Sequence, residues 1–191
     1  ICAMGGNAGP QFGTDGFGPR FAAQCGGALA PLYPCLTALQ CAKPDKRLAG
    51  IRAKAHAALY SGSTLLADYR GEVQFTDYGL SGICIMDLTR HLTPAVKSPA
   101  VELDLFPALD EAALAALFAA RPPRLAGDSP AEFWLGLVHP KLGRALWAAA
   151  RLPETSLHAL PPQAWQTLAR TAKHWRFEGL TPCGWKQAQT T

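Results

Sequence analysis

The sequence has no apolar run long enough to form a membrane-spanning helix. None of its hydrophobic stretches approaches the roughly 18 residues that crossing a bilayer requires. It also lacks the charged segment followed by an apolar segment that marks a secretory signal. Charged residues are few, at 17% of the 191 residues, while hydrophobic residues make up 49%. This balance is typical of a globular chain, so we expect a folded protein without a membrane partner.

The cysteines lack any spacing that would pair them. No C-x-x-C motif is present, and no two histidines lie at zinc-finger spacing, so we predict no metal site. Apolar neighbours, as in Ile83-Cys84-Ile85, favour reduced and buried thiols in a cytoplasmic protein. The six residues are Cys2, Cys25, Cys35, Cys41, Cys84 and Cys183.

Two motifs that would mark a self-contained enzyme are incomplete. Gly5, Gly6 and Gly9 resemble phosphate-loop glycines, but no G-x-G-x-x-G follows a strand and no acidic residue lies about 20 positions later. Residues 79–83 approach the G-x-S-x-G nucleophile elbow, but Ile83 stands where the strained turn needs glycine. We therefore expect no cofactor on this chain alone and no serine nucleophile, and the sequence assigns no catalytic residue.

The chain begins without an initiator methionine, at what reads as the end of a buried strand. Small and apolar residues 1–4 run into Gly5-Gly6, as a strand does where its backbone closely approaches a neighbour. We therefore expect these 191 residues to be an excised piece of a larger protein.

Short alternating runs before Pro107 predict a β-rich unit. Residues 51–60 and 101–106 alternate apolar and polar side chains, which indicates half-buried strands. Residues 71–76 form another predicted strand, and we expect 65–69 to pair with it through a turn at Arg70-Gly71. Residues 28–39 are apolar enough for a strand, but Pro31 and Pro34 favour an edge or a bulge.

Helical patterns follow Pro107. Asp110-Glu111 open one helix, a capping box from Ser129 to Glu132 opens a second helix that runs to about Val138, and prolines 140 and 161–162 open two more. Three tryptophans lie on the apolar stripes of this region and indicate core packing rather than a ligand stack: Trp134, Trp147 and Trp165. A last strand is predicted at 175–177. The sketch is α+β: a β-rich unit over 1–107, helices over 108–173, and a return to the β-rich unit over 174–191.

Residues 71–82 contain the most promising candidate site. A strand is predicted to end at Thr76-Asp77, pass through a glycine-spaced turn, and enter a helix. Backbone N–H groups at such a helix start can hold an anionic or carbonyl group. A well-capped helix whose glycines only serve the turn explains the pattern equally well. The candidate substrate-binding residues are Thr76, Asp77, Tyr78, Ser81 and Gly82.

A basic cluster gives an alternative. Five cations lie between Lys43 and Lys54, and a cluster of this size usually forms a solvated face. It could instead bind nucleic acid or a partner protein, through the strand around Arg52 and Lys54 together with the helical region. Salt-sensitive binding to RNA or DNA would favour this alternative, which we consider the weaker one.

Four segments resemble the BaiN-like (YhiN-type) FAD/NAD(P)-dependent flavoproteins. Residues 3–10 read A-M-G-G-N-A-G-P and 13–18 read G-T-D-G-F-G, similar to that family's A-T-G-G and T-G-D-G-Y segments. Residues 71–83, G-E-V-Q-F-T-D-Y-G-L-S-G-I, resemble its G-E-L-L-F-T-x-x-G-x-S-G segment. Residues 184–191, G-W-K-Q-A-Q-T-T, look like the G-x-x-x-A-x-V-T that leads back into the flavin domain. Met4 and Thr190 depart from the family's Thr and Val.

The resemblance implies a domain inserted between two halves of an FAD-binding domain. Its expected fold is a β-barrel-like unit carrying a small helical subdomain. The parent protein would use FAD and NAD(P)H to reduce an unsaturated or keto small molecule, one branch of the family being linked with bile-acid metabolism. The implied partners are the missing FAD-binding domain of the same polypeptide and the substrate. Gly5 and Gly6 would contact the flavin in the parent only.

Overall fold

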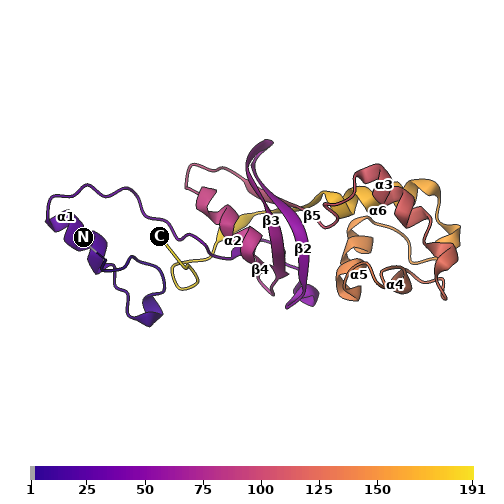
Figure 1. Ribbon diagram of the computed structural model, residues 1–191, viewed down its shortest axis with the longest axis horizontal. Coiled ribbons are helices and arrows are strands. Elements are labelled where there is room, and N and C mark those ends of the chain that lie inside the picture. Colours follow the sequence, from indigo (N-terminus) through magenta and orange to yellow (C-terminus); the bar gives the residue numbers. More distant parts are fainter. Residues whose placement is uncertain (1–2) are drawn as a thin grey trace.

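The computed structural model describes residues 3–191, which form three regions in a row (Figure 1). The N-terminal segment and the C-terminus lie together at one end. A curled sheet with one helix beside it forms the middle, and a group of helices forms the other end. Ile1 and Cys2, which begin the predicted N-terminal strand, lie outside the described residues. Met4 is 40% exposed and belongs to no strand, because this chain offers it no neighbouring strand to pair with.

All strand pairs of the sheet are antiparallel, in the order β6-β5-β2-β3-β4-β1-β7. The edge strands β6 and β7 are consecutive in the chain and joined by Gly179 alone. The sheet therefore curls back on itself, although its edges are not hydrogen-bonded into a closed ring. The strands are β1 (Leu39–Cys41), β2 (Arg52–Ser61), β3 (Thr64–Phe75), β4 (Gly79–Ser81), β5 (Pro99–Asp104), β6 (Trp175–Glu178) and β7 (Leu180–Pro182).

Aromatic contacts across the curl show how tightly the sheet closes. The ring of Phe75 on β3 lies 5.6 Å from that of Trp175 and 6.2 Å from that of Phe177, both on β6. Three strand positions separate β3 from β6 in the sheet order, so only strong curvature brings these rings together. The α+β class and the barrel-like character that the sequence suggested are confirmed.

Alternating residues predicted the three strands β2, β5 and β6 correctly. On β2, for example, Ala55, Ala57 and Leu59 are buried whereas Arg52 and Lys54 are exposed. Such alternation requires a sheet with one face covered.

The predicted turn at Arg70-Gly71 is wrong. Residues 64–75 form one continuous strand that pairs with β2 along its length, and the turn between them is Gly62-Ser63. Gly62 has φ +61°, a conformation that glycine adopts at no steric cost. Gly71 is instead a point of close approach, because a Cβ there would lie 3.2 Å from Cβ of Cys84.

Residues 28–39 contain much less strand than their apolar content suggested. Only Leu39–Cys41 forms β1, and Cys35 makes a single bridge to Thr190. The prolines at 31 and 34 remove backbone donors that a longer strand would need.

The helices after Pro107 start where capping residues predicted them. Asp110 accepts a 2.7 Å hydrogen bond from the Ala113 amide at the start of α3. Ser129 accepts from the Glu132 amide and donates to its carboxylate at the start of α4. The helices are α1 (Phe17–Gln24), α2 (Ile83–Leu88), α3 (Glu111–Ala119), α4 (Pro130–Phe133), α5 (Pro140–Ala149) and α6 (Pro162–Lys173).

Helix α4 is shorter than predicted, because it ends at Phe133 rather than near Val138. Nε and Nη2 of Arg121 donate to the carbonyls of Phe133 and Leu135 at 3.0 and 2.7 Å. Gly136 then takes φ +76°, which a helix cannot continue through. A side chain from outside the helix thus binds the carbonyls that a further turn would have used.

The three tryptophans are core residues, as predicted. Trp134, Trp147 and Trp165 are at most 5% exposed and surround Phe133, with ring centroids 5.0, 5.8 and 5.2 Å from it. The buried side chains of these helices and of the sheet belong to one continuous core.

Lys173 ties the helical region to the sheet. Its ammonium donates to the Asp104 carboxylate at 2.7 Å and to the carbonyls of Phe106 and Leu109 at 3.2 and 2.5 Å. The side chains of Lys173 and Asp104 are only 13% and 17% exposed. The end of α6 is therefore joined to the end of β5 and to the segment that leads into α3.

We predict that Lys173→Met lowers the free energy of unfolding by about 3–5 kcal/mol, because it leaves the Asp104 carboxylate buried without its partner. Arg170→Gln is the control: it breaks the exposed pair with Glu111 and should cost about 1 kcal/mol or less. Urea unfolding followed by tryptophan fluorescence measures both. Equal losses in the two variants would contradict the assigned importance of Lys173.

Candidate functional site

The two ends of the chain meet and bring three of the sequence motifs together. Gly9 N donates to Trp185 O at 2.9 Å, and Cys35 N donates to Thr190 O at 3.0 Å. Asn7 N donates to Oγ1 of Thr191 at 3.3 Å. Segments 3–10, 13–18 and 184–191 therefore form one local structure, although more than 160 residues separate the second from the third.

Glycines make this convergence possible. A Cβ on Gly6 would lie 2.4 Å from Oγ1 of Thr191, and a Cβ on Gly18 would lie 2.5 Å from the carbonyl of Gly5. Gly5 itself has φ +74° and is exposed. The backbone is thus exposed at Gly5 and closely packed at Gly6 and Gly18. The resemblance places the flavin contact of the parent protein at Gly5 and Gly6. A 460 Å³ hollow lies beside it, lined in part by Asn7 and Thr14.

Residues 76–82 form a hairpin rather than a simple turn into a helix. Thr76 N donates to Gly79 O, and Gly79 N donates to Oγ1 of Thr76, both at 2.9 Å. The chain then forms β4, which pairs with both β3 and β1. Strand β4 lies between the turn and α2. Its backbone groups therefore bond to β1 and β3, although the sequence suggested that they were free to bind a ligand.

The start of α2 offers few free donors. The amides of Ile85 and Met86 both bond to the carbonyl of Gly82, and the helix spans only six residues. Gly82 has φ +95°, and a Cβ there would lie 2.3 Å from the carbonyl of Glu72. Glycine at this position is therefore required by packing.

The side chains predicted to bind substrate do not converge on one point. Thr76 serves the turn, Asp77 is exposed and Ser81 is half-buried. The Tyr78 hydroxyl donates to Oε1 of Gln187 at 3.3 Å, so it reaches the C-terminal segment. Burial raises the pKa of the Tyr78 phenol, and the neighbouring Cys183 adds to the shift. The assignment of residues 76–78, 81 and 82 as substrate-binding residues stays a prediction.

A cluster that the sequence analysis missed lies beside α2. The Tyr69 hydroxyl on β3 is 3.0 Å from Nε2 of His91 and accepts a 3.1 Å hydrogen bond from Nη2 of Arg90. Arg90 and His91 belong to the 3₁₀ turn that follows α2. Twenty-two positions separate Tyr69 from His91, so no local sequence pattern could have joined them.

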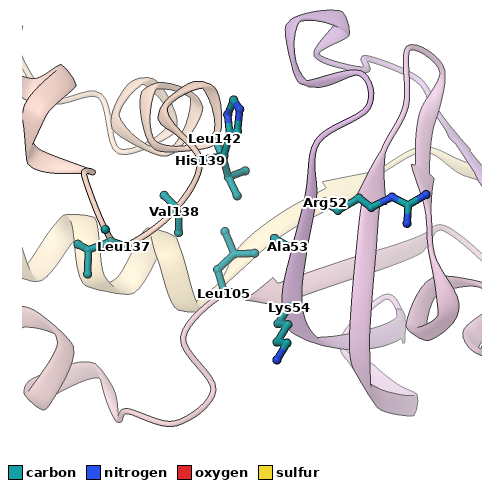
Figure 2. Close-up of a pocket in the computed structure, with 9 residues that line it drawn as sticks. Arg52, Ala53, Lys54, Leu105, Leu137, Val138, His139 and Leu142 are labelled. Carbon is teal, nitrogen blue, oxygen red and sulfur yellow. The ribbon is translucent and has the colours of Figure 1, made fainter.

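A cleft of about 470 Å³ separates β2 from the helical region (Figure 2). Figure 2 shows Leu142 and Leu105 projecting into it, whereas Arg52 points away across the sheet. Arg52 and Lys54 on β2 nevertheless contribute to its lining, together with His139 from the helical region.

The strand face carrying Arg52 and Lys54 is of mixed charge. Arg52 pairs with Glu72 at 3.1 Å, and Lys54 lies opposite Glu72 in the sheet register. His56 lies 2.5 Å from the Asp68 carboxylate. This balance gives no support to the nucleic-acid alternative.

Among residues 3–191 no group of histidine, cysteine and acidic side chains is arranged to hold a metal ion. Within the same residues no helix is long and apolar enough to cross a membrane. The described cysteines are all free. Cys2 lies outside the described residues.

The fold is thus a curled antiparallel sheet that carries a small helical region, and the two ends of the chain meet beside the sheet. A family profile for the HI0933-like protein barrel and H2TH domain matches residues 33–189. The chain belongs to this HI0933-like family, which confirms the resemblance noted from the motifs.

A curated relative is the 3-dehydro-bile acid delta(4,6)-reductase of Clostridium scindens. It is 30% identical over 178 residues, which cover 91% of this chain and 44% of the relative. The chain thus spans less than half the length of that reductase, and the family includes an oxidoreductase.

We predict that Gly82→Ala destabilises the fold by about 1–3 kcal/mol, because alanine must adopt a strained φ against the carbonyl of Glu72. Ser81→Ala changes a half-buried neighbour without that clash and should stay within about 0.5 kcal/mol of the wild type. Thermal unfolding by circular dichroism compares them. A Gly82→Ala protein as stable as the wild type would contradict the packing explanation.

We also predict selective thiol labelling. Burial raises the pKa of Cys41 and of Cys84 to about 11, so at pH 8 only on the order of one in a thousand of these thiols is ionised. Exposed Cys25 should react with iodoacetamide first, and labelling of the other two should increase as the pH is raised towards 11. Peptide mass spectrometry measures each site. Labelling of Cys84 as fast as that of Cys25 at pH 8 would disprove this order.

Proposed function

We propose that this chain is the substrate-side inserted domain of an FAD- and NAD(P)H-dependent oxidoreductase that reduces an unsaturated or keto small molecule. The observation that carries the proposal is the meeting of the two chain ends. An inserted domain must leave and rejoin its host at neighbouring points, and segments 3–10 and 184–191 lie hydrogen-bonded together.

Exposed apolar side chains gather at the same end. Phe12 is 85% exposed and Phe17 is 48% exposed, and the rings of Phe17 and Phe21 stack at 5.7 Å. A concentration of apolar surface of this kind marks a contact with another protein unit. The FAD-binding domain of the same polypeptide is the partner that the family resemblance implies.

The glycine-rich convergence supports a place for FAD beside it. Gly5 presents exposed backbone there, and a side chain at the half-buried Gly6 would have no room beside Thr191. FAD supplies the two-electron redox chemistry when bound, and the contribution of this chain is to position and shield the substrate. A cytoplasmic location, where free thiols and NAD(P)H are maintained, is part of the same proposal.

The substrate side of the domain, in this proposal, is the α2 side of the sheet. It carries residues 76–82, and α2 lies on the same side of the sheet as the chain ends (Figure 1). The relative's name suggests a conjugated ketone of the 3-dehydro bile-acid type as a first compound to test.

We predict that the polypeptide containing this chain purifies with about one equivalent of bound flavin, while residues 1–191 alone retain none. NAD(P)H should bleach the flavin band, and a 3-dehydro-Δ4,6 bile acid should restore it. Visible spectroscopy follows both steps. Stoichiometric flavin on the isolated chain, or none on the longer polypeptide, would refute the proposal.

A matched pair of variants tests the docking surface. Phe21 and Leu117 are each 37% exposed, but Phe21 lies on α1 at the terminal end and Leu117 on α3 in the helical region. Phe21→Ser should lower the flavin retained by the longer polypeptide, and Leu117→Ser should not.

A further inference from the structure

Tyr69, Arg90 and His91 form a compact cluster that the candidate segment 76–82 does not include. Nη2 of Arg90 donates to the Tyr69 hydroxyl oxygen at 3.1 Å, and Nε2 of His91 lies 3.0 Å from the same oxygen. The guanidinium carbon of Arg90 also lies 5.6 Å from the centre of the tyrosine ring. One phenol oxygen therefore contacts two nitrogen-bearing side chains.

Arg90 is held in place by α2. Its Nε donates to the carbonyl of Asp87 at 3.3 Å, and its Nη2 lies 3.6 Å from the Asp87 carboxylate. The guanidinium cannot lose its proton in proteins, so it always acts as a donor to Tyr69. The orientation of the phenol is thus set by the helix next to it.

The cluster contains a group that can donate a proton, the Tyr69 phenol, and a neighbour that can replace that proton, His91. Nη2 of Arg90 donates to the phenol oxygen, and Nε2 of His91 lies within hydrogen-bond distance of the same oxygen. Where Nε2 is the donor in that contact, the tyrosine O–H is free to point at a third group. A phenol in this position can give up its proton, because Arg90 stabilises the resulting phenolate and His91 can replace the proton.

The exposure of the Tyr69 and His91 side chains agrees with a role in proton transfer. Tyr69 is half-buried, whereas His91 is exposed and can exchange protons with water.

The cluster also lies on the side of the sheet that faces the chain ends. Arg90 and His91 continue directly from α2, and Figure 1 shows α2 on that side, opposite the helices α3 to α6. Ile83, at the start of α2, is 69% exposed. A ligand between α2 and a further domain would therefore meet an exposed apolar side chain of this helix.

We propose that Tyr69 is the proton donor in the reduction of a conjugated ketone, with His91 as its proton source and Arg90 as a positioning residue. This inference rests on the proposed function. Reduced flavin, when bound, would supply the hydride that forms a C–H bond at the β-carbon, and the C=C electron pair would move to give an enolate. The Tyr69 O–H bond would then break, and its proton would form a C–H bond at the α-carbon of the enolate, which gives the saturated ketone. The phenolate then takes a proton from His91, which takes one from water.

The test uses the flavin-loaded polypeptide and a 3-dehydro-Δ4,6 bile acid as the probe. Tyr69→Phe should slow reoxidation of the reduced flavin by the probe about 10²-fold, because the acid is lost. Reduction of the flavin by NAD(P)H should keep the wild-type rate, since that half-reaction needs no proton from Tyr69. Stopped-flow absorbance separates the two halves.

Tyr60→Phe is the matched control. Tyr60 also lies in the sheet with an arginine over its ring, Arg176 at 5.3 Å, but it belongs to the mixed-charge outer face. This variant should reoxidise at the wild-type rate. His91→Gln should slow repeated turnover more than the first turnover, because the first proton is already on Tyr69.

A binding measurement gives a readout independent of turnover. Perturbation of the oxidised flavin spectrum by the probe should give the same Kd in wild type and Tyr69→Phe, since the phenol acts on the reacting enone only after hydride transfer. Wild-type reoxidation in Tyr69→Phe would overturn the inference, and so would equal slowing of both half-reactions, which indicates a structural defect. If the wild-type polypeptide holds flavin but does not reduce the probe, the assignment of Tyr69 as proton donor for this substrate class is overturned. If the polypeptide holds no flavin, the proposed function itself is overturned.

Discussion

The buried ammonium of Lys173 fixes how the two halves of this fold are arranged. It neutralises Asp104 at the end of β5 and binds two carbonyls of the segment that enters α3. The amide of Leu105 donates to the carbonyl of Ala172 beside it. The chain leaves the sheet and returns to it at this one place, so these bonds decide where the whole helical region lies. Burying a charge here is tolerable only because every proton of the ammonium has an acceptor.

With the helices held at one end, the opposite side of the sheet stays free for function. Helix α2 lies there, and so do both chain ends with their uncovered glycines and exposed phenylalanines. In the helical region of α3 to α6, by contrast, the tryptophans are used for packing. The two ends of the molecule therefore differ: the buried aromatic core lies at one end, and the exposed phenylalanines and the glycine-rich chain ends lie at the other.

The sequence predicted elements well where the signal is local. Caps at Asp110 and Ser129 marked helix starts, because a capping side chain bonds within three residues of itself. Alternation marked β2 and β5. Predictions failed where a distant group intervened. Gly71 looked like a turn but accommodates Cys84, and α4 stops early because Arg121 binds its carbonyls. The candidate site was found only in part, since β4 was too short to recognise within 76–82.

By itself, the sequence determined the α+β class, the change from strands to helices after Pro107, the burial of the tryptophans and the family. All of these depend on spacing along the chain or on motifs within it. Only the tertiary structure decided that the sheet curls until Phe75 meets Trp175, that segments at opposite ends of the chain converge, and that Tyr69 meets Arg90 and His91. Contacts between residues far apart in sequence depend on sheet register and curvature, and neither leaves a periodic trace in the residues concerned.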